Sequence, residues 1–186
     1  MRQENRTDMN NRQSINIIRH CSILALMLTT LMLTACSVSY KFNGASIDYT
    51  KTKTIQIAQF PIRSAYVWGP MAPMFNNQLK DIYATQTKLR QVTRNGDLKI
   101  EGEITQYQQR NKSVSSEGYS AQVELSMTVN VRFTNNTNHN EDFEKQFSAS
   151  QYYDSSLSLG SVQDELVQNM IKDITEQIFN ATVANW

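Results

Sequence analysis

A run of strict alternation between apolar and polar residues decides the fold of this chain. It reads Ala121-Gln122-Val123-Glu124-Leu125-Ser126-Met127-Thr128-Val129-Asn130-Val131-Arg132-Phe133-Thr134. The apolar side chains recur at every second residue, which is the period of a β-strand and not of a helix. We therefore expect a long strand in an antiparallel sheet, with one dry face and one polar face.

Three shorter stretches around this run carry the same period of two. They are residues 52–60, 98–105 and 142–152. The Asn-rich segment 134–140 is typical of a turn, and it returns the chain from the long strand into the last one.

Two other stretches change to the helical period. From Met74 the apolar residues recur at spacings of three, four and seven, and they are Phe75, Leu79, Ile82, Leu89 and Val92. This stripe predicts a helix of about five turns, ended by Asn95-Gly96 and carrying cations in its last turns, where the helix dipole favours them. A second helix is predicted to begin near Ser161, on the stripe Leu166, Val167, Met170, Ile171, Ile174 and Ile178.

The order of these elements is β-α-β-β-β-α. It predicts an α+β fold in which two amphipathic helices pack on one face of a four-stranded mixed sheet. The second face of the sheet is then polar and available for contact.

The amino-terminal segment has the pattern of a secretion signal. Four arginines, Arg2, Arg6, Arg12 and Arg19, precede an apolar run over residues 21–33. A helix of that length spans roughly 20 Å, which is short of the ~30 Å hydrocarbon layer of a membrane. We therefore expect the segment to be removed.

The apolar run ends in Leu33-Thr34-Ala35-Cys36, which resembles the lipobox of bacterial lipoproteins. The resemblance implies cleavage before Cys36 and acylation of its thiol. It predicts a lipoprotein signal peptide over 1–35, the lipidated Cys and a tether over 36–51, and a single α+β domain over 52–186. Ser37 follows the Cys, and by resemblance to known sorting signals this suits an outer-membrane protein anchored by lipid on the periplasmic side.

Composition excludes several classes of function. The 186 residues have a formal net charge of +1 with interspersed signs, so we expect no nucleic-acid partner. Two Cys and two His are too few for a clustered Cys and His metal site, and no sequence motif for a cofactor is present. We expect neither a metal nor a cofactor.

Catalysis has two weak candidates. His139 sits in the Asn-rich turn, where we expect a solvated turn residue and not a general base. Carboxylates recur at strand spacing as Glu101 with Glu103 and as Glu141, Asp142 and Glu144, but alternate positions on a solvated sheet face are where charge belongs. We expect no catalytic residue and no enzyme.

A basic cluster, Lys88, Arg90, Arg94 and Lys99, has two interpretations. The cations either oppose the helix dipole or bind the phosphate of a phosphorylated lipid, which Arg matches in bidentate fashion.

Several segments together resemble one family. They are residues 46–50, Gln86-Thr87-Lys88-Leu89, Arg94-Asn95-Gly96-Asp97-Leu98, Glu101-Gly102-Glu103-Ile104 and the terminal residues 177–186. In their joint order they are similar to the LptE-family lipoproteins of Bacteroidetes. The resemblance implies a non-enzymatic lipopolysaccharide-assembly lipoprotein of the outer membrane, which is the plug and folding partner of the β-barrel translocon LptD.

The same resemblance implies lipopolysaccharide as a possible direct ligand. Basic residues contact it in relatives of this family, and our hypothesis gives that role to Arg90, Arg94 and Lys99. The alternative is an accessory or structural lipoprotein of another envelope complex, which has the same tether and fold without glycolipid binding.

Overall fold

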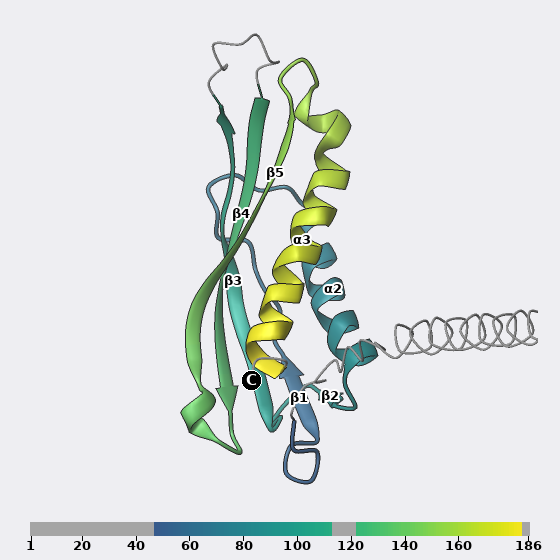
Figure 1. Ribbon diagram of the computed structural model, residues 1–186, viewed down its shortest axis with the longest axis vertical. Helices are drawn as coiled ribbons and strands as arrows, with labels where there is room; N and C mark the ends of the chain where they lie inside the picture. Colours follow the sequence, from purple (N-terminus) through teal and green to yellow (C-terminus); the bar gives the residue numbers. More distant parts are fainter. Residues whose placement is uncertain (1–46, 113–121, 184–186) are drawn as a thin grey trace, which may run out of the picture. The chain divides into compact units, whose positions relative to one another are not determined.

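A five-stranded mixed sheet carries two helices on one face in the computed structural model, which describes residues 47–112 and 122–183 (Figure 1). The elements are β1 Thr54–Ile57, α2 Met71–Gln86, β2 Arg90–Val92, β3 Leu98–Asn111, β4 Gln122–Asn135, β5 Phe143–Asp154 and α3 Leu159–Val183. A 3-10 turn, His139–Glu141, joins β4 to β5. The α+β class, the two helices and the mixed sheet are thereby confirmed.

The predicted number and order of the strands are wrong. The sheet has the order β2-β1-β3-β4-β5, in which β1 pairs in parallel with both β2 and β3, while β3, β4 and β5 form an antiparallel meander. The fifth strand is β2, which lies within the helix that the sequence predicted.

The long alternating run is the centre of the fold. Within β4, every second residue from Val123 to Phe133 is buried, and the residues between them are half-buried or exposed. In the pairing register Val129 lies between Ile104 of β3 and Phe147 of β5, so the buried positions of three strands form one continuous apolar face. Helices α2 and α3 cover that face (Figure 1).

Helix α2 begins three residues before the predicted start at Met74 and ends well before the predicted stop at Asn95-Gly96. It starts at Met71, and Pro73 lies in its first turn, where a missing N–H costs no intrahelical hydrogen bond. At its end Thr87 is extended, and its hydroxyl donates to the Tyr83 carbonyl at 2.7 Å and accepts from the Leu89 N–H at 3.1 Å. The chain is therefore already out of the helix when it reaches β2.

The turn between β2 and β3 is fixed by Asp97. Its Oδ2 accepts from the main-chain N–H of Lys53 at 2.8 Å, and from both the N–H and the hydroxyl of Thr54 at 2.9 and 2.8 Å. Asn95 has a φ of 52°, so the left-handed residue of this turn is Asn95, and it serves a strand-to-strand turn where the sequence predicted a helix end. The carboxylate thus holds the start of β1 beside β3.

Strand β3 runs six residues further than predicted. The register against β4 shifts between Ile104 and Gln106, which makes Thr105 the extra residue of a β-bulge. Beyond the bulge Tyr107 is buried, and its hydroxyl accepts from Gln163 Nε2 of α3 at 2.8 Å. The buried residues Ile104 and Tyr107 are three positions apart and not two. The extra residue of the bulge allows both side chains to point toward the helices.

The predicted signal peptide and the Cys36 acylation site lie outside the described residues, and the domain boundaries stay predictions. Among residues 47–112 and 122–183, neither helix combines the length and the apolar character that crossing a bilayer requires.

Candidate binding surfaces

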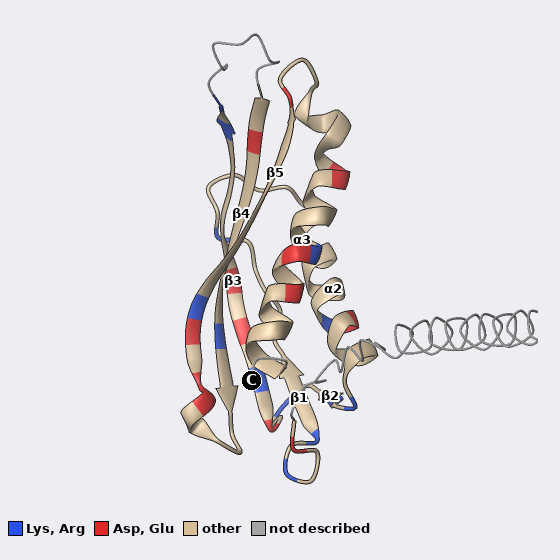
Figure 2. Cartoon of the chain, viewed as in Figure 1, with Lys and Arg blue, Asp and Glu red and all other residues tan. Residues whose placement is uncertain are grey.

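The basic residues proposed for lipopolysaccharide lie at one end of the sheet, and two of them share its outer face. Arg90 pairs with Thr54, and Lys99 pairs with Gln56, two residues further along β1. Because Ile55, between them, is buried under the helices, Arg90 and Lys99 are on the opposite, outer face, two strands or about 10 Å apart across the sheet. Figure 2 shows Lys and Arg positions gathered around β1 and β2.

The charges in this cluster differ in their partners. Lys99 Nζ lies 2.7 Å from Glu101 Oε2, so its charge is compensated. Arg90 and the turn residue Arg94 are exposed, and within the described part of the chain neither forms an ion pair. The helix-dipole interpretation is wrong, because the cluster begins after α2 has ended. The role in lipopolysaccharide binding stays a prediction.

The outer face of the meander is polar along its whole length, as predicted. The hydroxyls of Thr128 and Ser148 lie 2.9 Å apart across β4 and β5. Further along the same face, Arg132 binds Glu144 through two nitrogens, at 3.2 and 2.9 Å. These cross-strand contacts order the polar side chains, and the face presents hydroxyls, amides and paired charges to any partner.

The candidate catalytic groups form local structural contacts. His139 Nδ1 lies 3.0 Å from Asp142 Oδ2 inside the β4–β5 turn, and the other oxygen of that carboxylate accepts from the Asn135 N–H at 2.7 Å. The Asn135 hydrogen bond, with His139 adding to it, holds the pKa of Asp142 below its usual value. Glu103 forms an ion pair with Arg63, in which Oε2 lies 3.7 Å from Nε. No group of His, Cys, Asp and Glu in the described residues is arranged to hold a metal ion.

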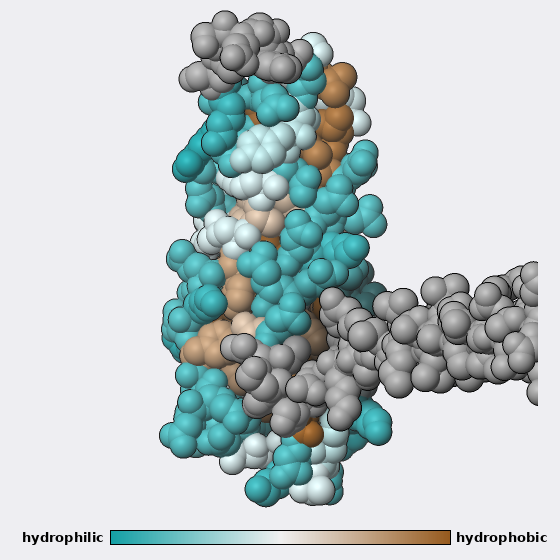
Figure 3. Space-filling view, in the orientation of Figure 1, coloured by the Kyte–Doolittle hydropathy of each residue, from teal (hydrophilic) through white to brown (hydrophobic). Residues whose placement is uncertain are grey.

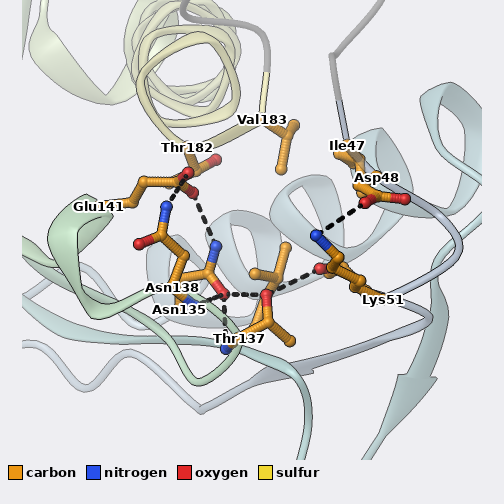
Figure 4. A pocket seen from close by; sticks show the side chains of 11 residues that line it. Ile47, Asp48, Lys51, Asn135, Thr137, Asn138, Glu141, Thr182 and Val183 are labelled. Atoms are coloured by element: carbon orange, nitrogen blue, oxygen red, sulfur yellow. Dashed lines mark hydrogen bonds and ion pairs between the residues drawn. The ribbon is translucent and has the colours of Figure 1, made fainter.

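A small pocket of about 260 Å³ lies where the turn 135–141, the end of α3 and residues 47–52 meet (Figure 4). Its polar side chains are bound to one another. Glu141 accepts from Asn135 Nδ2 at 2.7 Å and from Asn138 Nδ2 at 2.8 Å, while Asn135 Oδ1 accepts from the Thr137 N–H and hydroxyl. Because these side chains already bind one another, the pocket does not present them as free partners for a ligand.

A larger cleft of about 520 Å³ lies along β3 beyond its bulge, and no pattern in the sequence predicts it. Its walls are Ser64, Ala65, Tyr66, residues 105–109 of β3, Leu125 and Leu159. The Tyr66 ring stacks on the Tyr107 ring at a centroid distance of 5.4 Å and an interplanar angle of 19°. The bridge of Ile62 to Ile104 and the stacking of Tyr66 on Tyr107 bring residues 64–66 beside β3, and only these long-range contacts reveal the cleft.

The fold and its surfaces define a two-layer α+β domain that offers a polar sheet face, a basic sheet end and a cleft for binding. The chain belongs to the family described as "LptE: Lipopolysaccharide-assembly", which it matches over residues 52–182. The match extends from just before β1 to the last turn of α3. Its placement in the Bacteroidetes type stays a prediction.

Solved structures of bacterial lipoproteins are similar to this chain at low sequence identity. A minor lipoprotein from Acinetobacter baumannii has 14% identity and a TM-score of 0.47, over 68% of this chain and 88% of that one. Lipoprotein B from Nitrosomonas europaea has 18% identity and a TM-score of 0.44, over 68% and 81%. The rare lipoprotein B from Shewanella oneidensis has 11% identity and a TM-score of 0.41, over 68% and 92%. No curated protein sequence gives a significant match.

Proposed function

We propose that this protein is a non-enzymatic lipoprotein of the outer membrane that assists lipopolysaccharide transport as the plug and folding partner of the barrel LptD. The observation that carries the proposal is the family match over residues 52–182, because it spans every strand and nearly all of both helices of the described domain. A partial match to one element would not connect the whole domain to this function.

The outer sheet face supports a position inside a barrel. The lumen of a large outer-membrane barrel is polar, and a plug needs a surface that exchanges hydrogen bonds with it. The face opposite the helices offers such groups at Thr128, Asn130 and Ser148, with Glu144 paired to Arg132.

Purification of the affinity-tagged full chain from detergent-solubilised outer membranes tests the partnership. We expect LptD to be recovered in a stoichiometric complex. Recovery of a different envelope complex without LptD would instead support an accessory lipoprotein. Depletion of the chain is expected to lower lipopolysaccharide at the cell surface and LptD in the membrane.

The proposed glycolipid contact is tested by reversing the cluster at the sheet end. The triple variant Arg90→Glu, Arg94→Glu, Lys99→Glu should bind lipopolysaccharide at least about tenfold more weakly, because one lost charge-assisted hydrogen bond is worth about 1.5 to 3 kcal/mol. A matched control, Lys80→Glu, Lys145→Glu, Lys172→Glu, changes the net charge equally at α2, β5 and α3. Equal binding by the two triple variants would remove Arg90, Arg94 and Lys99 from the site.

A further inference from the structure

Strand β3 has a neighbour on both sides only up to its bulge. The segment after β1 follows it this far, with the Ile104 N–H donating to the Pro61 carbonyl at 2.9 Å and the Arg63 N–H donating to the Ile104 carbonyl at 2.8 Å. The chain then turns away toward α2. From Gln106 to Asn111, β3 pairs with β4 on one side, and the other side is an open sheet edge within the described residues.

The main-chain groups on that edge are identified by the register. The Lys112 N–H donates to the Gln122 carbonyl at 2.9 Å, so Lys112 belongs to the residues whose main chain faces β4. In an antiparallel ladder such residues alternate with residues that face away. The N–H and C=O groups of Tyr107, Gln109 and Asn111 therefore point to the open edge, and in residues 47–112 and 122–183 they have no main-chain partner there.

The 520 Å³ cleft lies along this edge and has an uncharged lining. Leu125 of β4 and Leu159 of α3 supply its apolar side, and Gln106 and Gln108 of the outer face supply its polar side. Tyr66, half exposed, and Tyr107 form a stacked wall. Figure 3 shows hydrophobic surface gathered over the first turns of α3, at the same end of the domain.

The two edge strands of the sheet, β5 and β2, do not combine free main-chain groups with an uncharged cleft. On β5, Lys145 lies on the helix-facing side of the edge, and Gln177 Nε2 donates to the Ser148 carbonyl at 3.3 Å. On the other edge, β2 has three residues and begins at the cation Arg90. Inward charge, capped carbonyls and short strands are the devices that keep sheet edges from pairing.

We propose that the β3 edge beyond Ile104 receives an extended segment of a partner protein, which adds a strand beside Tyr107, Gln109 and Asn111. Apolar side chains at every second position of that segment would contact Leu125 and Leu159, and the polar ones between them would lie beside Gln106 and Gln108. An acyl chain fits the apolar side of the cleft but leaves the exposed row of main-chain groups without hydrogen bonds. This inference goes beyond the proposed function and does not depend on the identity of the barrel.

The test uses the protein as purified from cell membranes in detergent micelles and a capped synthetic octapeptide, Lys-Val-Thr-Val-Thr-Val-Thr-Lys. We expect bound peptide to slow hydrogen exchange at the amides of Tyr107, Gln109 and Asn111 by about tenfold or more, as strand pairing does. A peptide that is N-methylated at every residue has no N–H to donate from either edge and should bind about tenfold more weakly.

A chain variant tests the same geometry from the other side. Gln109→Pro removes an N–H that faces the cleft and leaves the pairing with β4 intact, so it should abolish peptide binding while Gln109→Ala retains it. Equal binding of the plain and N-methylated peptides would overturn strand addition in favour of apolar contact alone. Slow exchange of the three amides before any peptide is added would also overturn it, because a second copy or the chain's own residues would then occupy the edge.

Discussion

At the scale of single residues, Gly102 has the least room for change. A Cβ there would overlap the Asn130 carbonyl of β4 and lie 2.6 Å from Phe60 Cε1. We expect Gly102→Ala to lower the free energy of unfolding by about 2 to 3 kcal/mol, because backbone and a buried ring must both move. Urea denaturation measures the loss.

Gly160 provides the matched control for this substitution. A Cβ at Gly160 in the first turn of α3 meets no atom within 4 Å, so Gly160→Ala should leave stability unchanged or raise it by up to about 1 kcal/mol. Similar losses in both variants would contradict the steric explanation.

Asp97 makes the free energy of unfolding of the domain depend on pH in the acidic range. The main-chain N–H of Lys53, together with hydrogen bonds from Thr54, holds the pKa of Asp97 below its usual 3.8. Since the folded state has the lower pKa, the contribution of Asp97 is complete above pH 3.8 and is lost as the pH falls through the lower, folded value.

The variant Asp97→Asn tests this dependence. We expect it to be less stable than wild type by about 2 kcal/mol at pH 7, because neutral hydrogen bonds replace charge-assisted ones. The difference should shrink in denaturation curves recorded at progressively lower pH. A difference that is constant down to the acid transition would show that the charge is unimportant.

At the scale of elements, α2 and β2 show where the sequence misled. Leu89 and Val92 continue the helical spacing set by Phe75, Leu79 and Ile82, so the stripe predicts one long helix. In the structure they belong to the connection and to a strand too short to show alternation. Thr87 ends the helix through two side-chain hydrogen bonds. No pattern in the surrounding sequence predicts them.

The cleft was missed for a related reason. The bulge at Thr105 changes the phase of the alternation in β3, and the sequence therefore predicted a strand that ends there. The strand continues, but the segment 61–63 beside it does not, and their different lengths leave the edge open. By contrast β4, whose pattern is unbroken, was predicted within one residue at each end.

The contact between α2 and α3 is tested by the buried hydroxyls of Tyr83 and Thr182, which bind each other. Burial raises the pKa of Tyr83 above its usual value. The Thr182 hydroxyl donates to the Ile178 carbonyl at 2.9 Å, so the Tyr83 phenol is the donor to Thr182. Tyr83→Phe and Thr182→Val should each cost about 1 kcal/mol, and the double variant should cost less than their sum by a coupling of about 1 kcal/mol. Strictly additive losses would show that the two hydroxyls do not cooperate.

At the scale of the whole molecule, the two layers and the polar outer face are predictable from the sequence. The alternation in one long strand shows a face that must be covered by helices and a face that stays polar. The position of Arg90 could not be predicted, since it depends on a parallel pairing with Thr54 that leaves no periodic signal. The family resemblance drawn from short segments in joint order agrees with the match over residues 52–182.

The proposed anchor is tested with two cysteine variants of the full chain. Cys36→Ala should lose palmitate labelling, because the thiol that accepts the acyl group is removed. Cys21→Ala, within the predicted signal peptide, should be labelled like wild type. Equal labelling of Cys36→Ala and wild type would reject acylation at this site.

The place of β1 in the sheet has a consequence for how the protein acquires its structure. Ribosomes deliver β1 first, yet it belongs between β2 and β3, which are made later. The meander of β3, β4 and β5 closes through contacts between consecutive strands, whereas β1 must wait for partners beyond α2. Because contacts between distant segments form slowly, we expect insertion of β1 to be the late step of folding, and a chain caught before it is completed exposes a vacant groove beside β3 to chaperones.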